Sequence, residues 1–222
     1  MSEQSDIIEA LGVAGQFDAA EEAPRRVAFL KDYLVASGAQ AFVLGISGGV
    51  DSLTAALMAQ TAVKELRSAG HKAEFIAVRL PYGTQADEKD AQAALAVIRP
   101  DRTFTINIKA AADAMMGELR AGGFEPLDEA QADFLLGNIK ARQRMIAQYA
   151  LAGGLRGLVI GTGHGHEAIM GFFTKHGDGA ADILPLAGLN KRRVRALAKH
   201  FGAPDPLVFK VPTADLENNA PL

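Results

Sequence analysis

The chain has 222 residues, of which 49% are hydrophobic and 22% charged, as expected for a globular domain with a well-buried core. Its formal net charge of −3 gives no electrostatic argument for nucleic-acid binding, which usually needs a basic surplus. The absence of cysteine excludes disulfides, thiolate metal sites and cysteine nucleophiles. No apolar stretch has the length of a membrane span, and the first residues do not read as a secretory signal. We therefore expect one cytoplasmic domain over residues 1–222.

Apolar runs rich in Val, Ile and Phe alternate with stretches whose apolar residues recur at helical spacing. In chain order, we expect a helix at 23–37, a strand at 41–46, a helix at 52–68, a strand at 74–78, a helix at 85–98, a strand at 103–108, a helix at 129–151, a strand at 157–160 and a basic helix at 191–201, with loops at 177–180 and 218–222. This alternation predicts an α/β fold with a doubly wound parallel sheet flanked by helices. Ligands of such sheets bind at the carboxyl ends of the strands.

Residues 45–52 read GISGGVDS, between the first predicted strand and the helix that follows it. Adjacent glycines let the backbone approach a ligand closely, and the helix N-terminus directs unpaired N–H groups at an anion. Ser47 and Ser52 add hydroxyl donors. A carboxylate at Asp51 would repel phosphates unless a divalent cation such as Mg²⁺ lay between them. The segment therefore predicts a nucleotide site with a metal ion.

The simpler interpretation of this segment is a strand-to-helix turn in which Ser52 or Asp51 serves as the N-cap. We favour the nucleotide site because the whole run lies between a strand and a helix. The segment is not a Walker A loop, which requires a lysine, and it is not a G-x-G-x-x-G fingerprint.

Two further strand ends carry polar residues. After the second strand, RLPYGTQ places Arg79 and Gln85 beside a stiffened turn. The alternatives are a surface turn with a solvent-facing Arg79 and, for Gln85, a plain helix start. After the fourth strand, GTGHGHE carries Thr162, two histidines and Glu167. The spacing does not match a zinc motif, so we interpret Glu167 as a second oxygen ligand for magnesium and Thr162 as a nucleotide contact. An acidic residue that complements the helix dipole is the alternative for Glu167.

The remaining candidates lie in charged segments. Residues 172–182, FFTKHGDGAAD, have the composition of a mobile active-site loop, although ordinary surface loops share this composition. The basic run at 191–195 is expected to be mostly a solvated face, with one cation near a departing pyrophosphate. Arg142 and Arg144 lie two apart in a predicted helix and face different ways, so at most one should reach a given site.

Taken together, GISGGVDS, RLPYGTQADE, GNIKARQRMIAQYALAG, GTGHGHEAIMGFFTKHGDGAADILPL, LNKRRVRALA and VPTADLE resemble the ammonia-dependent NAD synthetase family, part of the N-type ATP pyrophosphatase superfamily. The resemblance implies a Rossmann-like, adenine nucleotide alpha hydrolase-like fold. It also implies a homodimeric C–N ligase that adenylates the nicotinate carboxylate of deamido-NAD with Mg-ATP. Ammonia then displaces AMP to give NAD.

The resemblance also implies roles for individual residues. Those implied to contact ATP are Gly45, Ile46, Ser47, Gly48, Gly49, Val50, Asp51, Ser52, Arg79, Gln85, Thr162, Lys191 and Thr213. Asp51 and Glu167 would hold magnesium, whereas Arg142, Lys175, Asp178 and Asp182 would form the deamido-NAD site or its closing loop. We assign the catalytic roles to Asp51, Lys191 and Asp178. A cysteine-free chain would take free ammonia or receive it from a partner.

Two departures from the family pattern leave alternatives open. Gly163 stands where the family usually has an aspartate, and the sequence ends soon after TADLE, where the family continues with a basic segment that helps to bind deamido-NAD. One alternative is a non-catalytic module that binds adenine nucleotides. The other is a different adenylating N-type pyrophosphatase.

Overall fold

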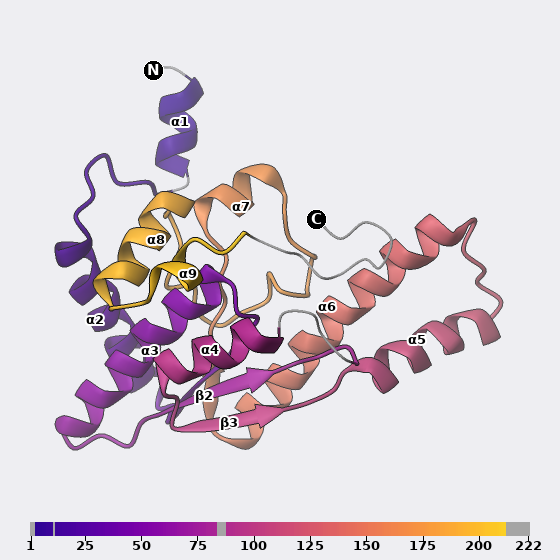
Figure 1. Ribbon diagram of the computed structural model, residues 1–222, viewed down its shortest axis with the longest axis horizontal. Helices are drawn as coiled ribbons and strands as arrows, with labels where there is room; N and C mark the ends of the chain where they lie inside the picture. The colour runs from indigo at the N-terminus through magenta and orange to yellow at the C-terminus, as the bar shows by residue number, and fades with distance from the viewer. Residues whose placement is uncertain (1–2, 11, 84–87, 212–222) are drawn as a thin grey trace.

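The computed structural model describes residues 3–10, 12–83 and 88–211, which fold around a four-stranded parallel sheet (Figure 1). The strands are β1 (Ala41–Gly45), β2 (Glu74–Arg79), β3 (Arg102–Thr105) and β4 (Gly157–Val159), in the spatial order β3-β2-β1-β4. From β1 the chain moves outward through β2 to β3 and then returns to place β4 on the other side of β1. The strand order therefore reverses between β1 and β4, where ligands of such sheets bind.

Both faces of the sheet are covered because successive side chains in a strand point to opposite sides. Phe42 and Leu44 of β1 enter one apolar cluster, whereas Ala41 and Val43 enter the other. This arrangement explains why the central strand β1 is continuously apolar, whereas the edge strand β3, with the sequence RTFT, is mostly exposed.

Helices on the first face build the larger cluster. These are α2 (Ala19–Ser37), α3 (Val50–Ser68), α4 (Glu88–Ile98), α8 (Lys191–His200) and α9 (Asp205–Val208). Helix α3 lies at the centre of this layer and buries 13 of its residues. Its residues at 55, 56, 59 and 62 are alanines, whose small side chains allow close packing of a helix against its neighbours.

The opposite face is covered by α6 (Glu129–Gly154), against which α5 (Lys109–Ala121) packs. Figure 1 shows α5 and the first half of α6 extending from the sheet as an arm, while α1 (Glu3–Ala10) stands apart from the body. The short helix α7 (Gly165–Met170) follows β4. No helix in the described ranges combines the length and apolar character needed to cross a bilayer.

The predicted alternation of strands and helices is confirmed, but several boundaries differ. Helix α2 begins at Ala19, a turn earlier than expected, because the side chain of Asp18 caps it by accepting a hydrogen bond from the backbone N–H of Ala20. Strand β3 ends at Thr105 and not at residue 108. Helices α1, α5, α7 and α9 were not predicted. The expected loop at 218–222 lies outside the described residues.

Candidate active site at the ends of β1 and β4

A cavity of about 260 Å³ opens where β1 and β4 separate. Ladder pairing between these strands stops at Val43 and Val159, after which the chain leaving β4 turns toward Ile183. Predicted site residues that line the cavity are Gly45, Ile46, Ser47, Asp51, Ser52, Arg79, Thr162, Glu167 and Asp178. The three strand-end segments identified in the sequence therefore converge on one site.

The loop between β1 and α3 requires glycine at position 48. Gly48 has φ +86°, and a Cβ added there would lie 2.8 Å from the backbone nitrogen of Ala91. The next residue, Gly49, is the N-cap of α3, and no side chain caps the helix. The N-terminal amides of α3 are therefore not blocked by a capping side chain, which favours binding of a phosphate.

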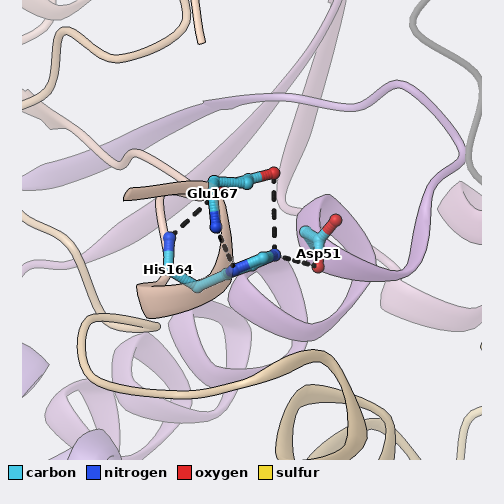
Figure 2. A group of neighbouring side chains, drawn as sticks. All are labelled: Asp51, His164 and Glu167. Carbon is cyan, nitrogen blue, oxygen red and sulfur yellow. Dashed lines mark hydrogen bonds and ion pairs between the residues drawn. The ribbon is translucent and has the colours of Figure 1, made fainter. Parts of the chain in front are cut away.

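Asp51 lies in the first turn of α3 and is held by two different partners. Its Oδ2 forms an ion pair with Nζ of Lys191 from α8, and its Oδ1 lies 3.4 Å from Nε2 of His164 (Figure 2). Burial alone would raise the pKa of Asp51, but the nearby imidazole and ammonium groups outweigh that effect and hold it below its usual value. Asp51 is therefore ionised at neutral pH.

Glu167 approaches Asp51 from α7, where it belongs to a reciprocal cap. Its backbone N–H donates to Nδ1 of His164 at 3.4 Å, and its Oε2 accepts from the backbone N–H of His164 at 3.3 Å. Burial raises the pKa of Glu167, and the adjacent charge of Asp51 acts in the same direction.

The two carboxylates and the imidazole form a group that suits a divalent cation. One ligand atom from each of Asp51, His164 and Glu167 lies within 4.8 Å of the other two. Carboxylate oxygens are the ligands that Mg²⁺ prefers, so the donor set fits the predicted ion.

Arg79 connects the phosphate loop to α4. Its side chain is only 2% exposed, one nitrogen donates to the carbonyl of Ile46, and another pairs with Glu88 at 2.5 Å. Much of its hydrogen-bonding capacity is thus used within the protein, although Nε of Arg79 is buried without a partner among the described residues.

The segment at 172–182 places its two aspartates differently. Asp178 lines the cavity and accepts a hydrogen bond from the backbone of Thr174 at 2.8 Å. Asp182 lies outside the cavity lining and instead accepts from the backbone N–H of Val159 at 2.7 Å and from the hydroxyl of Tyr149 at 3.3 Å. Lys175 is exposed, and its carbonyl accepts from Arg142 at 3.2 Å.

The NAD synthase family profile matches residues 22–221. The chain is 62% identical over 211 residues to the NH(3)-dependent NAD(+) synthetase of Burkholderia mallei (strain SAVP1), covering 95% of this chain and 74% of that protein. The chain belongs to the NAD synthase family. The predicted family and its C–N ligase activity are thereby confirmed.

Solved structures place the fold in the same family. The crystal structure of NAD+ synthetase from Burkholderia pseudomallei superposes with a TM-score of 0.88 at 60% identity, covering 97% of this chain and 79% of that one. NMN synthetase from Francisella tularensis has a TM-score of 0.77 at 35% identity, covering 91% and 79%. The predicted α/β fold is therefore confirmed by both topology and superposition.

For this NAD synthase family member, α6 contributes Gln148, which the sequence analysis did not single out, and one of the two arginines that were predicted to face different ways. Arg144 lines the cavity and donates from Nε to the carbonyl of Leu80 at 3.2 Å, whereas Arg142 contacts the 172–182 segment. Gln148, four residues after Arg144, also lines the cavity and accepts from the backbone N–H of Gly45 at 2.7 Å. The spacing of four residues on one predicted helix was the available signal.

Other predicted residues lie beside the cavity or outside the described ranges. Gly48, Gly49 and Val50 do not line the cavity: the two glycines form the turn before α3, and Val50 is its first residue. Lys191 reaches the site through Asp51. Gln85 and Thr213 lie outside the described residues.

Proposed function

We propose that the protein joins ammonia to the nicotinate carboxylate of deamido-NAD at the expense of ATP, which yields NAD, AMP and pyrophosphate. The observation that carries this proposal is an uncapped helix N-terminus and a pair of carboxylates in one cavity. The first suits phosphate groups, and the second suits the cation that accompanies them. The 62% identity to an NH(3)-dependent NAD(+) synthetase supports the same reaction.

The reaction has two steps. A carboxylate oxygen of deamido-NAD attacks the α-phosphorus of ATP, and the bond from that phosphorus to the bridging oxygen breaks, so pyrophosphate leaves. The carboxylate oxygen now belongs to a mixed anhydride with AMP, from which AMP is a good leaving group. Ammonia attacks the acyl carbon, the bond from that carbon to the AMP oxygen breaks, and a proton is lost to give the carboxamide. No side-chain nucleophile is required, in agreement with the absence of cysteine.

Groups of the chain itself lower the repulsion between the carboxylate of deamido-NAD and the triphosphate of ATP. Amides at the start of α3 and the hydroxyls of Ser47 and Ser52 bind phosphate oxygens. Lys191 supplies a positive charge beside Asp51 and, after nucleotide binding, toward the departing pyrophosphate. Asp51 and Glu167 would hold Mg²⁺, which supplies charge neutralisation on the phosphates.

The deamido-NAD side of the site rests on the 172–182 segment and α6. We assign Asp178, Lys175 and Arg142 to this side because Asp178 lines the cavity and Arg142 contacts the backbone of Lys175. We give Asp182 a supporting role, since its carboxylate holds the end of β4. The roles of Gln85 and Thr213, the homodimer and the cytoplasmic location remain predictions.

Formation of NMN is a second candidate reaction because NMN synthetase from Francisella tularensis shares the fold at 35% identity. The higher identity to NAD synthetases favours deamido-NAD as the substrate. A binding module without turnover is disfavoured, because nucleotide binding alone does not require two neighbouring, partly buried carboxylates, one of which pairs with a lysine.

The proposal is tested by measuring AMP and pyrophosphate release from Mg-ATP. Deamido-NAD and nicotinate mononucleotide are compared as acceptors, each with ammonium, with glutamine and without a nitrogen source. We expect NAD to form from deamido-NAD and ammonium, in stoichiometry with AMP. ATP binding without AMP release under every condition would refute turnover, and preference for the mononucleotide would reassign the substrate.

A further inference from the structure

His164 is the most enclosed member of the group at the cavity, yet the reaction described above gives it no role. Its side chain is fully buried, whereas the side chains of Asp51 and Glu167 are 18% and 25% exposed. Figure 2 shows its ring between the two carboxylates, with one nitrogen facing α7 and the other facing α3.

The first nitrogen fixes the protonation of the second. Nδ1 of His164 accepts the backbone N–H of Glu167, so Nδ1 carries no proton. In the neutral imidazole the proton is therefore on Nε2. That atom lies 3.4 Å from Oδ1 of Asp51 and 3.6 Å from Oε1 of Glu167.

Nε2 has no other hydrogen-bond partner within the described part of the chain, and neither has Oδ1 of Asp51. Both atoms are buried, and a buried polar atom without a hydrogen-bond partner destabilises the fold. The remaining oxygen of Asp51, Oδ2, already belongs to Lys191. Nε2–H of His164 is thus positioned to donate a hydrogen bond to Oδ1 of Asp51.

We propose that His164 is a positioning residue that uses Nδ1 to cap α7 and Nε2–H to orient the carboxylates of Asp51 and Glu167 for a divalent cation. This inference rests on the proposed magnesium site. Because the Nε2 lone pair is occupied by a proton, the imidazole donates a hydrogen bond instead of ligating the ion. The ligands left for the cation are then oxygens, which suit Mg²⁺ better than zinc.

The variant H164N separates the capping of α7 from the contact with the carboxylates. Asparagine is a good N-cap, so its carboxamide oxygen can accept the N–H of Glu167, but its side chain is too short to reach Asp51. The matched control is H166N, because His166 is exposed, lies in the same turn and stacks on His164 with ring centroids 6.2 Å apart.

Binding of α,β-methylene-ATP, in which the scissile bridge is blocked, is measured calorimetrically with Mn²⁺ and with EDTA. We expect the Mn²⁺ complex to bind wild-type protein and H166N more tightly than the metal-free nucleotide. In H164N, this advantage should fall about 10- to 100-fold, as is typical when a partner of metal ligands is removed. Binding of the metal-free nucleotide should not change, which a general structural role of His164 would not predict.

The outcomes distinguish the two proposals. If the wild-type protein gains nothing from Mn²⁺, the metal site itself is refuted. If Mn²⁺ raises the nucleotide affinity of the wild-type protein and of H164N equally, the positioning role is refuted. Should H164N fail to fold, ¹⁵N chemical shifts of the wild-type imidazole decide the matter, since a proton on Nδ1 of His164 contradicts the inference and a proton on Nε2 supports it.

Discussion

Two helices, α3 and α7, begin at the cavity, and their N-termini differ in side-chain capping. The N-cap of α3 is Gly49, which provides no side-chain cap, whereas the N-cap of α7 is His164, which forms a reciprocal cap with Glu167. An uncapped N-terminus keeps its amides for a ligand, and a capped one uses them to fix its own side chains. The α3 terminus is thus suited to bind an anion. The α7 terminus is suited to hold a carboxylate in a fixed position.

Removal of Asp51 should have the largest effect on turnover, because this residue of α3 contacts His164, the N-cap of α7. D51A is expected to lower turnover by about three orders of magnitude or more, in line with the several kcal/mol that a metal contributes to stabilising transition-state charge. AMP release is measured under saturating Mg-ATP, and circular dichroism checks that the fold is retained. Turnover close to the wild-type rate would exclude a metal role for Asp51.

The next largest effect concerns the turn before α3. G48A should lower both stability and nucleotide affinity, because a Cβ meets the backbone of Ala91 at 2.8 Å and the residue has φ +86°. Gly70 provides a matched control, since it has φ +87° with nothing within 4 Å of an added Cβ. G70A should cost about 1 kcal/mol of unfolding free energy. G48A should lower the unfolding free energy by more than G70A does, and of the two variants only G48A should weaken ATP binding. Equal losses of stability and affinity in both variants would show that the close contact with Ala91 is unimportant.

A cap added to α3 should make it resemble α7. Gly49 has φ −80° and ψ 159°, and an added Cβ would lie 3.4 Å from Oγ of Ser47, so another residue fits. G49S and G49D should each raise the unfolding free energy by about 0.5–1 kcal/mol, through the cap and reduced chain entropy. We expect ATP affinity to fall modestly in G49S and about tenfold or more in G49D, which adds a negative charge. Thermal unfolding and calorimetric titration measure the two quantities, and tighter binding in either variant would contradict the importance of open amides.

The smallest effect tests how the α7 side is supported. Arg26 of α2 donates to the carbonyls of Pro185 and Ala187, and the nearby carbonyl of Leu189 accepts from Gly165, the first residue of α7. Glu22 pairs with Arg26 at 2.7 Å. Burial alone would raise the pKa of Glu22, but Arg25 and Arg26 together outweigh that effect and lower it below the usual 4.5.

Because the folded-state pKa of Glu22 is lowered, its stabilising contribution is present above the unfolded-state pKa and is lost as the pH falls through the folded-state value. E22Q should therefore lower the unfolding free energy by about 1 kcal/mol at neutral pH, and the difference should vanish in acid. Denaturant unfolding at several pH values measures this, with E21Q as the exposed control. A deficit that persists unchanged in acid would show that the charge of Glu22 is not its source.

The sequence predicted the part of the site that lies on contiguous motifs. Ser47, Asp51 and Glu167 follow strands, so the parallel topology brings them together at the cavity. The position of His164 between two carboxylates was not predictable from spacing, because it depends on how α7 turns toward α3. The contributions of Arg144 and Gln148 also depend on the orientation of α6, which local periodicity does not fix.

Gln148 has a consequence for the shape of the sheet. Gly45 pairs with Val78 of β2, but the ladder between β1 and β4 ends at Val43 and Val159. The backbone N–H of Gly45 donates to the side-chain oxygen of Gln148, which takes the place of a β4 carbonyl. The gap between the two strands is therefore spanned by a replaceable side chain and not by the main chain. A single substitution at this position of α6 can alter the width of the cavity while the topology of the sheet stays the same.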